Sequence, residues 1–341
     1  MALTKEEIKK FREIVANTYR PLIFFDDDPD GMSSFLQIYK EIGDGRGFVL
    51  KTAPELSASF SSRTEHYEHD RVFILDIPSI SQEFLDNVKS DVVWLDHHPV
   101  VLRKKVTYFN PRVHNDKDNR PTSYWLYRIF KKNLWIAMVG CIGDWFIPEF
   151  SDAFSEKFPD LLPKGITYPG EALFDTKIGL LAKIVSFNLK GKHSDVMKSM
   201  KILTRIESPY EILKQTTPRG KFVYKRFEQI NKEYEELLSS VEISDDSILF
   251  FEYNDSTTSF TGDMSNELLY RYPEKIIIVA RSRNGEMKCS LRASKYKLSN
   301  LVKKALLDVD GYGGGHTYAC GACIKIPDFQ KFLQNLRDQI R

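Results

Sequence analysis

The sequence has only four cysteines among its 341 residues, too few for the disulfide framework that stabilises many secreted domains. It also has no long apolar run: the longest, residues 134–143, falls far short of the roughly 18 residues that a membrane-spanning helix needs. The N-terminal segment MALTKEEIKKFREIV reads as a charged amphipathic helix rather than a signal peptide. We therefore expect a soluble cytoplasmic protein that has no membrane partner.

Strong net charge is missing as well. The chain carries 49 Lys and Arg against 47 Asp and Glu, a formal net charge of +2 at pH 7. This balance gives no global basic signal for nucleic acid binding, although a local basic surface remains open. No repeat or low-complexity tract is present. The length is sufficient for two domains with cores of their own.

Four short apolar runs each stop at an aspartate. Continuous apolar runs without strict alternation favour strands that are covered on both faces, as in a parallel α/β sheet. Helical stretches at 33–42 and 123–132 lie between them. Because ligands bind beyond the carboxyl ends of the strands in such sheets, we expect the four carboxylates to meet there. The runs and the acids that follow them are 21–25 and Asp26, 72–75 and Asp76, 92–95 and Asp96, and 136–143 and Asp144.

The stretch FFDDDPDGMSS at 24–34 places four acids in five positions. Carboxylates this close repel one another and lose stability unless a cation lies among them. His97 and His98, directly after Asp96, add nitrogen ligands of the kind that Mn, Fe or Zn accept. A single aspartate after a strand is more often a turn residue or a helix cap, but that does not explain the whole set. The sequence predicts a metal site with two ions.

The ordered motifs resemble those of the DHH phosphoesterase superfamily, from about residue 20 to the C-terminus. The final motif is similar to that of the DHH-associated C-terminal domain. In the first motif, Asp26 stands where nanoRNases and family II pyrophosphatases have histidine, and Met32 where they have an acid; the carboxylate at Asp28 resembles the RecJ branch instead. The motifs are DDDPDG at 26–31, Asp76, DHH at 96–98, GDW around Asp144 and GYGGGH at 311–316.

The resemblance implies two divalent ions, Mn²⁺ in preference to Mg²⁺, with Asp76 bridging both. Asp96 is implied to accept the N–H of an imidazole so that the other ring nitrogen faces the metal, and His98 to hydrogen-bond a phosphate oxygen. Asp96 and His98 are thus the implied catalytic residues, in addition to the metal ligands. The implied metal ligands are Asp26, Asp28, Asp30, Asp76, His97 and Asp144.

The implied substrate-binding residues lie near the C-terminus. Glycines allow close backbone approach, so successive N–H groups can form an anion-binding nest; a tight turn is the alternative. Arg292 is expected on a strand after a turn at Asn284 and Gly285, where its guanidinium would grip a phosphate; an ordinary exposed strand arginine is the alternative. The implied set is Arg292, Gly313, Gly314, Gly315 and His316.

We expect three segments: an α/β catalytic domain at 1–185 with a mainly parallel sheet flanked by helices, a helical linker at 186–245, and a smaller α/β substrate-binding domain at 246–341. The active site is expected in the cleft between the domains. Residues 214–227 carry five basic residues and no acid, interleaved with aromatics. They could follow a nucleic acid strand or form a solvated helix face. We interpret His66 and His69 as surface residues.

The resemblance thus implies a two-metal phosphodiesterase or exonuclease that releases nucleoside 5′-monophosphates. Its implied partners are single-stranded DNA, RNA or short oligonucleotides, together with replication or repair proteins. A nanoRNase or a cyclic-dinucleotide phosphodiesterase is the nearest alternative. A non-catalytic replication scaffold is a further alternative, although every ligand position of the motif set is filled in this chain.

Overall fold

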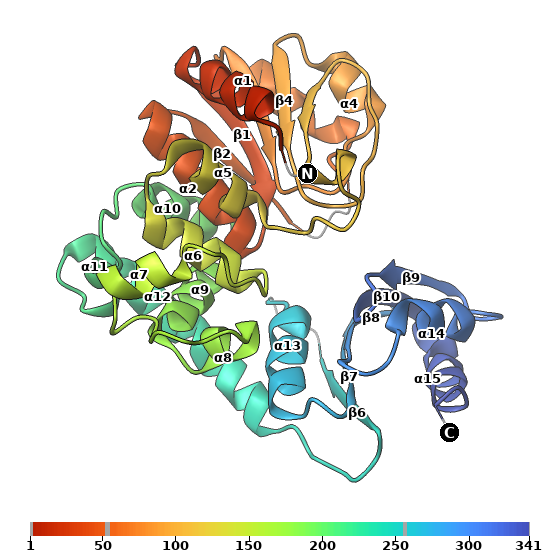
Figure 1. Ribbon diagram of the computed structural model, residues 1–341. Helices are drawn as coiled ribbons and strands as arrows, with labels where there is room; N and C mark the ends of the chain where they lie inside the picture. Colours follow the sequence, from red (N-terminus) through yellow and green to blue (C-terminus); the bar gives the residue numbers. More distant parts are fainter. Residues whose placement is uncertain (1–2, 52–54, 255–257, 341) are drawn as a thin grey trace. The chain divides into compact units, whose positions relative to one another are not determined.

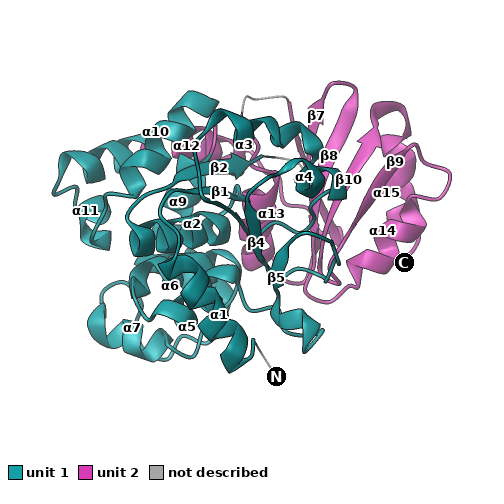
Figure 2. Ribbon diagram, turned by 90° about the horizontal axis from the view of Figure 1, so that it is seen from above, with its two compact units in different colours: residues 1–189, 193–227 teal, residues 190–192, 228–341 magenta. Residues whose placement is uncertain are grey.

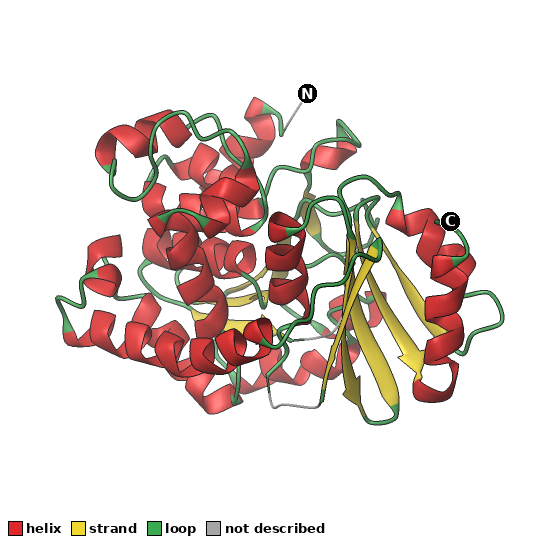
Figure 3. Ribbon diagram, turned by 90° about the horizontal axis from the view of Figure 1, so that it is seen from below, coloured by secondary structure: helices red, strands yellow, loops and turns green. Residues whose placement is uncertain are grey.

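A computed structural model describes residues 3–51, 55–254 and 258–340. The chain forms two compact units, which we call unit 1 (residues 1–189 and 193–227) and unit 2 (residues 190–192 and 228–341) (Figure 2). Each unit contains one five-stranded sheet with helices packed against it (Figure 3). The predicted α/β class, with a parallel-sheet domain followed by a smaller sheet domain, is confirmed.

The sheet of unit 1 is parallel throughout, in the order β2-β1-β3-β4-β5. Phe25 pairs with Leu75, and Leu75 with Leu95, so the carboxyl ends of the three central strands lie side by side. The predicted strands at 21–25, 72–75 and 92–95 are confirmed. The strands are β1 (Pro21–Asp26), β2 (Arg46–Leu50), β3 (Arg71–Leu75), β4 (Asp91–Leu95) and β5 (Thr107–Phe109) (Figure 1).

Helices cover both faces of this sheet. On one face Phe25 stacks on Phe35 of α2, with ring centroids 4.9 Å apart, and Phe11 of α1 packs edge-on against Phe73. On the other face Phe24 and Phe48 belong to a buried cluster. A fully buried side chain of this size contributes roughly 2 kcal/mol. The covering elements include α1 (Lys5–Ala16), α2 (Pro29–Ile42), η1 (Ala58–Phe60), α3 (Ser62–His66) and α4 (Gln82–Asn87).

The prediction of a fourth strand at 136–143 is wrong, because these residues form the helix α6 (Leu134–Gly143). All eight residues at 135–142 are buried, and a helix that is apolar all round has the same sequence pattern as a doubly covered strand. Its close packing against α2 requires glycine, because a Cβ on Gly143 would lie 2.5 Å from Cβ of Pro29. Asp144 therefore comes from a helix C-terminus, where it is the C-cap.

The remaining helices of unit 1 follow the sheet in the sequence. Residues 218–227 form the first part of α12. Val223 and Phe227 are buried there, and Phe227 packs on Phe187. Apolar residues turned inward are what the helix-face interpretation of 214–227 predicts. No helix within residues 3–51, 55–254 and 258–340 combines the length and the apolar character needed to cross a bilayer. The helices are α5 (Thr122–Phe130), α7 (Ser151–Lys157), α8 (Pro169–Phe174), α9 (Lys177–Asn188), α10 (His193–Leu203), α11 (Pro209–Leu213) and α12 (Pro218–Ser239), which continues into unit 2 from residue 228.

The sheet of unit 2 has the order β6-β7-β8-β10-β9 and is antiparallel except for the pair β6 and β7. The predicted turn at Asn284 and Gly285 joins β7 to β8, with φ angles of 52° and 78°. Helices α14 and α15 share a core with one face, while Ser265 of α13 hydrogen-bonds Ser290 of β8. The elements are β6 (Ile248–Tyr253), α13 (Thr261–Arg271), β7 (Ile276–Arg283), β8 (Glu286–Arg292), α14 (Leu298–Ala305), β9 (Gly311–Gly315), β10 (Ala319–Lys325) and α15 (Phe329–Arg337).

The packing of α6 on α2 predicts that Gly143→Ala destabilises unit 1 by about 1–3 kcal/mol, because the added methyl group overlaps Pro29. Urea unfolding followed by tryptophan fluorescence measures this directly, since all four tryptophans lie in unit 1. Gly262→Ala is the control, because a Cβ there meets no atom within 4 Å. A wild-type unfolding midpoint for Gly143→Ala would contradict the close packing of the two helices.

Candidate metal centre

The predicted metal ligands come together at the carboxyl edge of the unit 1 sheet. They form three overlapping groups, and within each group one ligand atom per residue lies within 4.8 Å of the others. His98, which was predicted as a phosphate contact, belongs to one of these groups. Each group could hold a metal ion. The groups are Asp76 with His97 and His98, Asp30 with His97 and Asp144, and Asp26 with Asp28 and Asp76.

The first motif delivers its acids from the end of β1 and the start of α2. Asp26 is the last residue of β1. Asp28 is the N-cap of α2, where its Oδ1 accepts a hydrogen bond of 2.8 Å from the N–H of Gly31. The capping explanation is thus correct for Asp28, and the same carboxylate also belongs to the acidic cluster. Capping and metal binding are compatible because a carboxylate has about four acceptor sites.

Asp30 is held by the N-terminus of α5. Its Oδ2 accepts from the N–H of Thr122 at 2.7 Å and its Oδ1 from the N–H of Ser123 at 2.9 Å. Asp30 is only 1 % exposed, and a helix N-terminus stabilises such a buried carboxylate. The Thr122 hydroxyl lies 3.3 Å from Oδ1 of Asp76, so this residue links two of the acids. Thr122 was not predicted as part of the site, because a threonine at a helix start is ordinary in any chain.

Asp76 follows β3 in a left-handed backbone conformation, with φ of 59°, which is uncommon for a residue other than glycine. Its Oδ1 lies 3.3 Å from Nε2 of His97, and that nitrogen lies 3.8 Å from Oδ2 of Asp144. The other nitrogen, Nδ1, lies 3.1 Å from the carbonyl oxygen of Asn119. Donation from Nδ1 to this carbonyl leaves Nε2 as the nitrogen that faces the carboxylates, the usual arrangement of a metal-binding histidine.

Asp96 accepts the N–H of an imidazole as expected, but the imidazole is that of His98. The Nδ1 atom of His98 lies 2.8 Å from Oδ1 of Asp96, and its backbone N–H donates to Oδ2 at 3.0 Å. Asn110 holds the same pair, because its Nδ2 lies 3.3 Å from Asp96 and 3.0 Å from the carbonyl oxygen of His98. Asn110 was not predicted as part of the site. Asp96 therefore orients His98, and the Asn119 carbonyl orients His97.

The electrostatics of the cluster favour protonation of several carboxylates in the absence of a cation. Burial, together with the charge of Asp30, raises the pKa of Asp28 to about 6. Burial also raises the pKa of Asp144 to about 8. The pKa values of Asp26 and Asp76 are raised well above the usual range by burial and by the neighbouring acids. The His97 imidazole lowers the pKa of Asp28 and Asp144 but does not offset burial and the neighbouring acids.

Burial opposes the charged form of His97, but the neighbouring carboxylates, Asp144 first, outweigh burial and raise the pKa of the imidazole. One histidine cannot neutralise the whole cluster. Carboxylate oxygens with one or two imidazoles form a donor set that suits Mn²⁺, Fe²⁺ or Zn²⁺. The residues present therefore fit a divalent ion, which would supply the missing positive charge.

The predicted phosphate-binding arginine of unit 2 is fixed by its surroundings. Nε of Arg292 donates to Oδ1 of Asn266 at 2.7 Å, and Nη1 donates to Oγ of Ser290 and to the carbonyl oxygen of Leu291, each at 3.0 Å. Burial lowers the pKa of the guanidinium to about 10, so it remains charged at neutral pH. The loosely exposed strand arginine of the alternative interpretation does not match these contacts.

The glycine triplet Gly313, Gly314 and Gly315 forms part of the edge strand β9 rather than a tight turn. Its residues pair with β10, Gly315 opposite Cys320, and all of β9 is exposed. Gly315 has φ of 141°, which favours glycine. The N–H of His316 donates to the carbonyl oxygen of Ala319, and Ala319 pairs with Arg292 across β8 and β10. Arg292 and the glycine strand therefore lie at the same end of the sheet.

The raised pKa values predict how stability depends on pH. Between about pH 4, the ordinary aspartate value, and the raised values of Asp28 and Asp144, the folded metal-free protein binds more protons than the unfolded chain. Its free energy of unfolding should therefore fall as pH rises from 5 to 8. Asp76→Asn removes one of the mutually repelling carboxylates. Its Tm should therefore fall less between pH 5 and pH 8 than the Tm of the wild type, by about 2 °C or more.

Thermal unfolding with and without Mn²⁺ checks this prediction. At pH 7.5, Mn²⁺ should raise the Tm of the wild type and of Asp152→Asn, a control at an exposed acid on α7. It should not raise the Tm of Asp76→Asn. A steeper pH-dependent loss in Asp76→Asn than in the wild type would contradict the electrostatic account of the cluster.

Comparisons with known proteins agree with this architecture. Residues 245–341 match the DHHA1 domain family. Among solved structures, the chain is similar to RecJ of Thermus thermophilus in complex with Mn²⁺, with a TM-score of 0.70 and 14 % identity over 99 % of this chain and 55 % of that one. The chain thus spans about half the length of that RecJ.

Two further structures are similar over nearly the whole of both chains. One is the DHH domain of a member of the s1p family of ribosomal proteins, with a TM-score of 0.67 and 14 % identity over 98 % of this chain and 89 % of that one. The other is exonuclease RecJ bound to manganese, with a TM-score of 0.61 and 13 % identity over 98 % and 94 %. No curated protein sequence matches the chain.

At these identities the structural likeness establishes the fold, and the family match establishes the C-terminal domain. Both agree with the resemblance found in the motifs, which is confirmed at this level. Residues 245–341 match the DHHA1 domain family, and the chain as a whole has a fold like that of RecJ.

Proposed function

We propose that the chain is a two-metal-dependent phosphodiesterase that acts as an exonuclease on single-stranded nucleic acid or short oligonucleotides and releases nucleoside 5′-monophosphates. The observation that carries this proposal is the convergence of carboxylates and imidazoles from β1, α2, α6 and the ends of β3 and β4 in three groups suited to a metal ion. The DHHA1 domain at 245–341 and the fold shared with an exonuclease bound to manganese support it.

In this proposal Asp26, Asp28, Asp30, Asp76, His97 and Asp144 hold the ions. Divalent ions, Mn²⁺ in preference to Mg²⁺, would polarise the phosphodiester and lower the pKa of the attacking water. Nδ1 of His98 faces Asp96, so Nε2 is the ring nitrogen left to face the substrate, and as an imidazolium His98 would donate from it to a phosphate oxygen. Asp96 and Asn110 keep this imidazole in place before the substrate arrives, which reduces the entropic cost of reaching the transition state.

We propose that unit 2 provides the residues that bind the substrate. Asn266 accepts from Nε of Arg292, and Ser290 and the carbonyl oxygen of Leu291 accept from Nη1, an arrangement that directs Nη2 to a phosphate oxygen. The exposed glycine strand at Gly313, Gly314 and Gly315 allows close backbone approach, with His316 at its end. Arg292 would then contribute to substrate binding and positioning and not to metal binding, because a guanidinium cannot coordinate a cation.

A side-by-side assay with Mn²⁺ tests the proposed function. Single-stranded DNA and RNA 20-mers, short oligonucleotides, dinucleotides and cyclic dinucleotides would be incubated with the full chain, and the products separated by chromatography. Mononucleotides released progressively from one end of the longer strands are the expected result. Hydrolysis confined to dinucleotides or to cyclic dinucleotides would favour the alternatives instead. Stoichiometric Mn²⁺ binding without cleavage of any phosphodiester would overturn the proposal in favour of a scaffold.

Replacing a ligand should abolish activity without unfolding the protein. In His97→Ala and Asp76→Ala, we expect Mn²⁺ binding in equilibrium dialysis to weaken and the turnover with Mn²⁺ to fall by about 100-fold or more, a loss of roughly 3 kcal/mol of transition-state stabilisation. His193→Ala, at an exposed histidine of α10, is the matched control. Unchanged turnover in Asp76→Ala would refute the assignment of the site.

Arg292→Ala should separate substrate binding from metal binding. We expect unchanged Mn²⁺ content, a raised KM, and a kcat/KM reduced by about 30-fold, which corresponds to about 2 kcal/mol for a desolvated charged hydrogen bond. Arg292→Lys keeps the charge but loses the planar fork and should recover only part of this loss. Arg337→Ala, on α15, controls for the loss of a positive charge from unit 2. Equal loss of Mn²⁺ in Arg292→Ala and His97→Ala would contradict the division of roles.

A further inference from the structure

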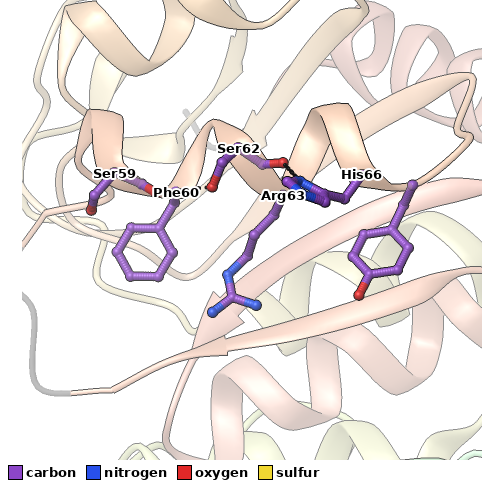
Figure 4. Close-up of a pocket in the computed structure, with 6 residues that line it drawn as sticks. Ser59, Phe60, Ser62, Arg63 and His66 are labelled. Atoms are coloured by element: carbon purple, nitrogen blue, oxygen red, sulfur yellow. Dashed lines mark hydrogen bonds between the residues drawn. The ribbon is translucent and has the colours of Figure 1, made fainter.

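A pocket of about 400 Å³ lies in unit 1 outside the acidic cluster. It is formed by η1, α3 and the residue that follows α3, and none of the predicted metal ligands lines it. Figure 4 shows that Phe60 and Arg63 project to the same side of this segment. We call it the η1–α3 pocket. Its lining residues are Ser59, Phe60, Ser62, Arg63, His66 and Tyr67.

Arg63 lines the pocket, and a second guanidinium, that of Arg46, lies against the lining residue Tyr67 without itself lining the pocket. The Arg63 guanidinium carbon lies 5.0 Å from the ring centroid of Phe48 on β2, and 5.9 Å from that of Phe60. Arg46, also on β2, places its guanidinium carbon 5.7 Å from the same Phe48 ring and 3.5 Å from the Tyr67 ring. The distance of 3.5 Å means that the Arg46 guanidinium rests directly on the tyrosine face.

These two positive charges have no acidic counterpart at the pocket. Within the parts of the chain that the structure describes, neither guanidinium makes an ion pair, and the nearby acids are engaged elsewhere. Glu68 pairs with Arg20 at 2.8 Å, and Glu55 lies 3.0 Å from the Ser79 hydroxyl and 3.6 Å from Arg103. Glu65 and Glu68 line a neighbouring pocket, which shares Tyr67 with this one. Two like charges gathered in this way repel each other, and a bound anion would relieve the repulsion.

The shape and chemistry of the pocket indicate the class of anion. A guanidinium that lies on an aromatic ring keeps its N–H groups in the plane of the fork, free to bind two oxygens of a phosphate. Ser59 and Ser62 add hydroxyl groups at the rim, and the part-exposed Phe60 ring offers a face on which a base can stack. Positive forks interleaved with aromatic faces are characteristic of sites that bind nucleotides of a single strand.

We propose that the η1–α3 pocket binds nucleotide phosphate through Arg46 and Arg63, with the base against the neighbouring aromatic side chains. It would be a second nucleotide-binding site of unit 1, separate from the acidic cluster. The phosphate could belong to a polynucleotide strand or to a free nucleotide, since the two present the same group. The inference concerns binding alone and does not require hydrolysis, so it can be tested without metal.

The test is fluorescence anisotropy of a labelled eight-nucleotide oligothymidine with the full chain in EDTA. We expect the double variant Arg46→Ala/Arg63→Ala to raise Kd by about tenfold or more. The slope of log K against log salt should also become shallower by about 1 to 1.5, because each phosphate contact on a single strand contributes about 0.7. Arg205→Ala, at an exposed arginine of unit 1, is the matched control and should bind like the wild type.

A double lysine variant is the control for misfolding of the double alanine variant. Arg46→Lys/Arg63→Lys keeps both charges and should retain the salt slope while losing part of the affinity, because ammonium groups lack the fork. Tryptophan fluorescence should give the wild-type unfolding midpoint for this variant. Competition with thymidine monophosphate or inorganic phosphate identifies the source of the bound phosphate. Displacement of the labelled oligonucleotide at a low competitor concentration indicates that the pocket binds a free nucleotide. If the oligonucleotide is not displaced, the pocket binds a polynucleotide strand.

The inference is overturned if both double variants bind the oligonucleotide like Arg205→Ala, or if the wild type does not bind it in EDTA. The second result, combined with cleavage of the same oligonucleotide in Mn²⁺, would leave the proposed function intact. Conversely, the protein could bind the oligonucleotide through Arg46 and Arg63 and yet cleave no substrate. That result would support this binding site and refute the proposed function.

Discussion

Parallel pairing of β1, β3 and β4 in one register forces Asp26, Asp76 and Asp96 to the same edge of the unit 1 sheet. The carboxylates cannot move apart without breaking a core in which nearly every residue of the three strands is buried. Their mutual repulsion is therefore built into the fold rather than into a flexible loop. Much of the remaining structure at this edge, including the start of α5 and the residues after β5, serves to satisfy these charges.

The acids of the cluster are satisfied to different degrees. Asp30 receives two backbone N–H groups from α5, and Asp96 receives donors from His98 and Asn110. Oδ1 of Asp76 has two distant partners, the Thr122 hydroxyl and Nε2 of His97, each at 3.3 Å, and its pKa is raised well above the usual range by burial and by the other acids. The well-satisfied acids can orient their neighbours, whereas the poorly satisfied ones concentrate the negative potential that attracts a cation.

Sequence patterns were sufficient wherever the side-chain type decides the structure. The three strands that end at Asp26, Asp76 and Asp96 could be predicted because their continuous apolar runs match a doubly covered sheet. The α6 helix could not, since an apolar run buried on all sides carries no periodicity. Thr122 and Asn119 also escaped prediction, because they act through a backbone N–H, which every residue except proline has, and a backbone carbonyl, which every residue has. The glycine triplet was expected to form a nest or a turn, and glycine's low strand propensity concealed the edge strand β9.

The glycine content of β9 has a consequence for solubility as well as for ligand approach. An exposed edge strand is a template on which a strand of another molecule can pair, and this is a common route to aggregation. β9 is exposed at all five residues, GYGGG, and forms one edge of its sheet. With a single side chain larger than hydrogen, it offers an incoming strand almost no cross-strand contacts and loses much conformational entropy when it is ordered. The same composition that leaves its backbone open to a small anion therefore makes it a poor partner for another polypeptide.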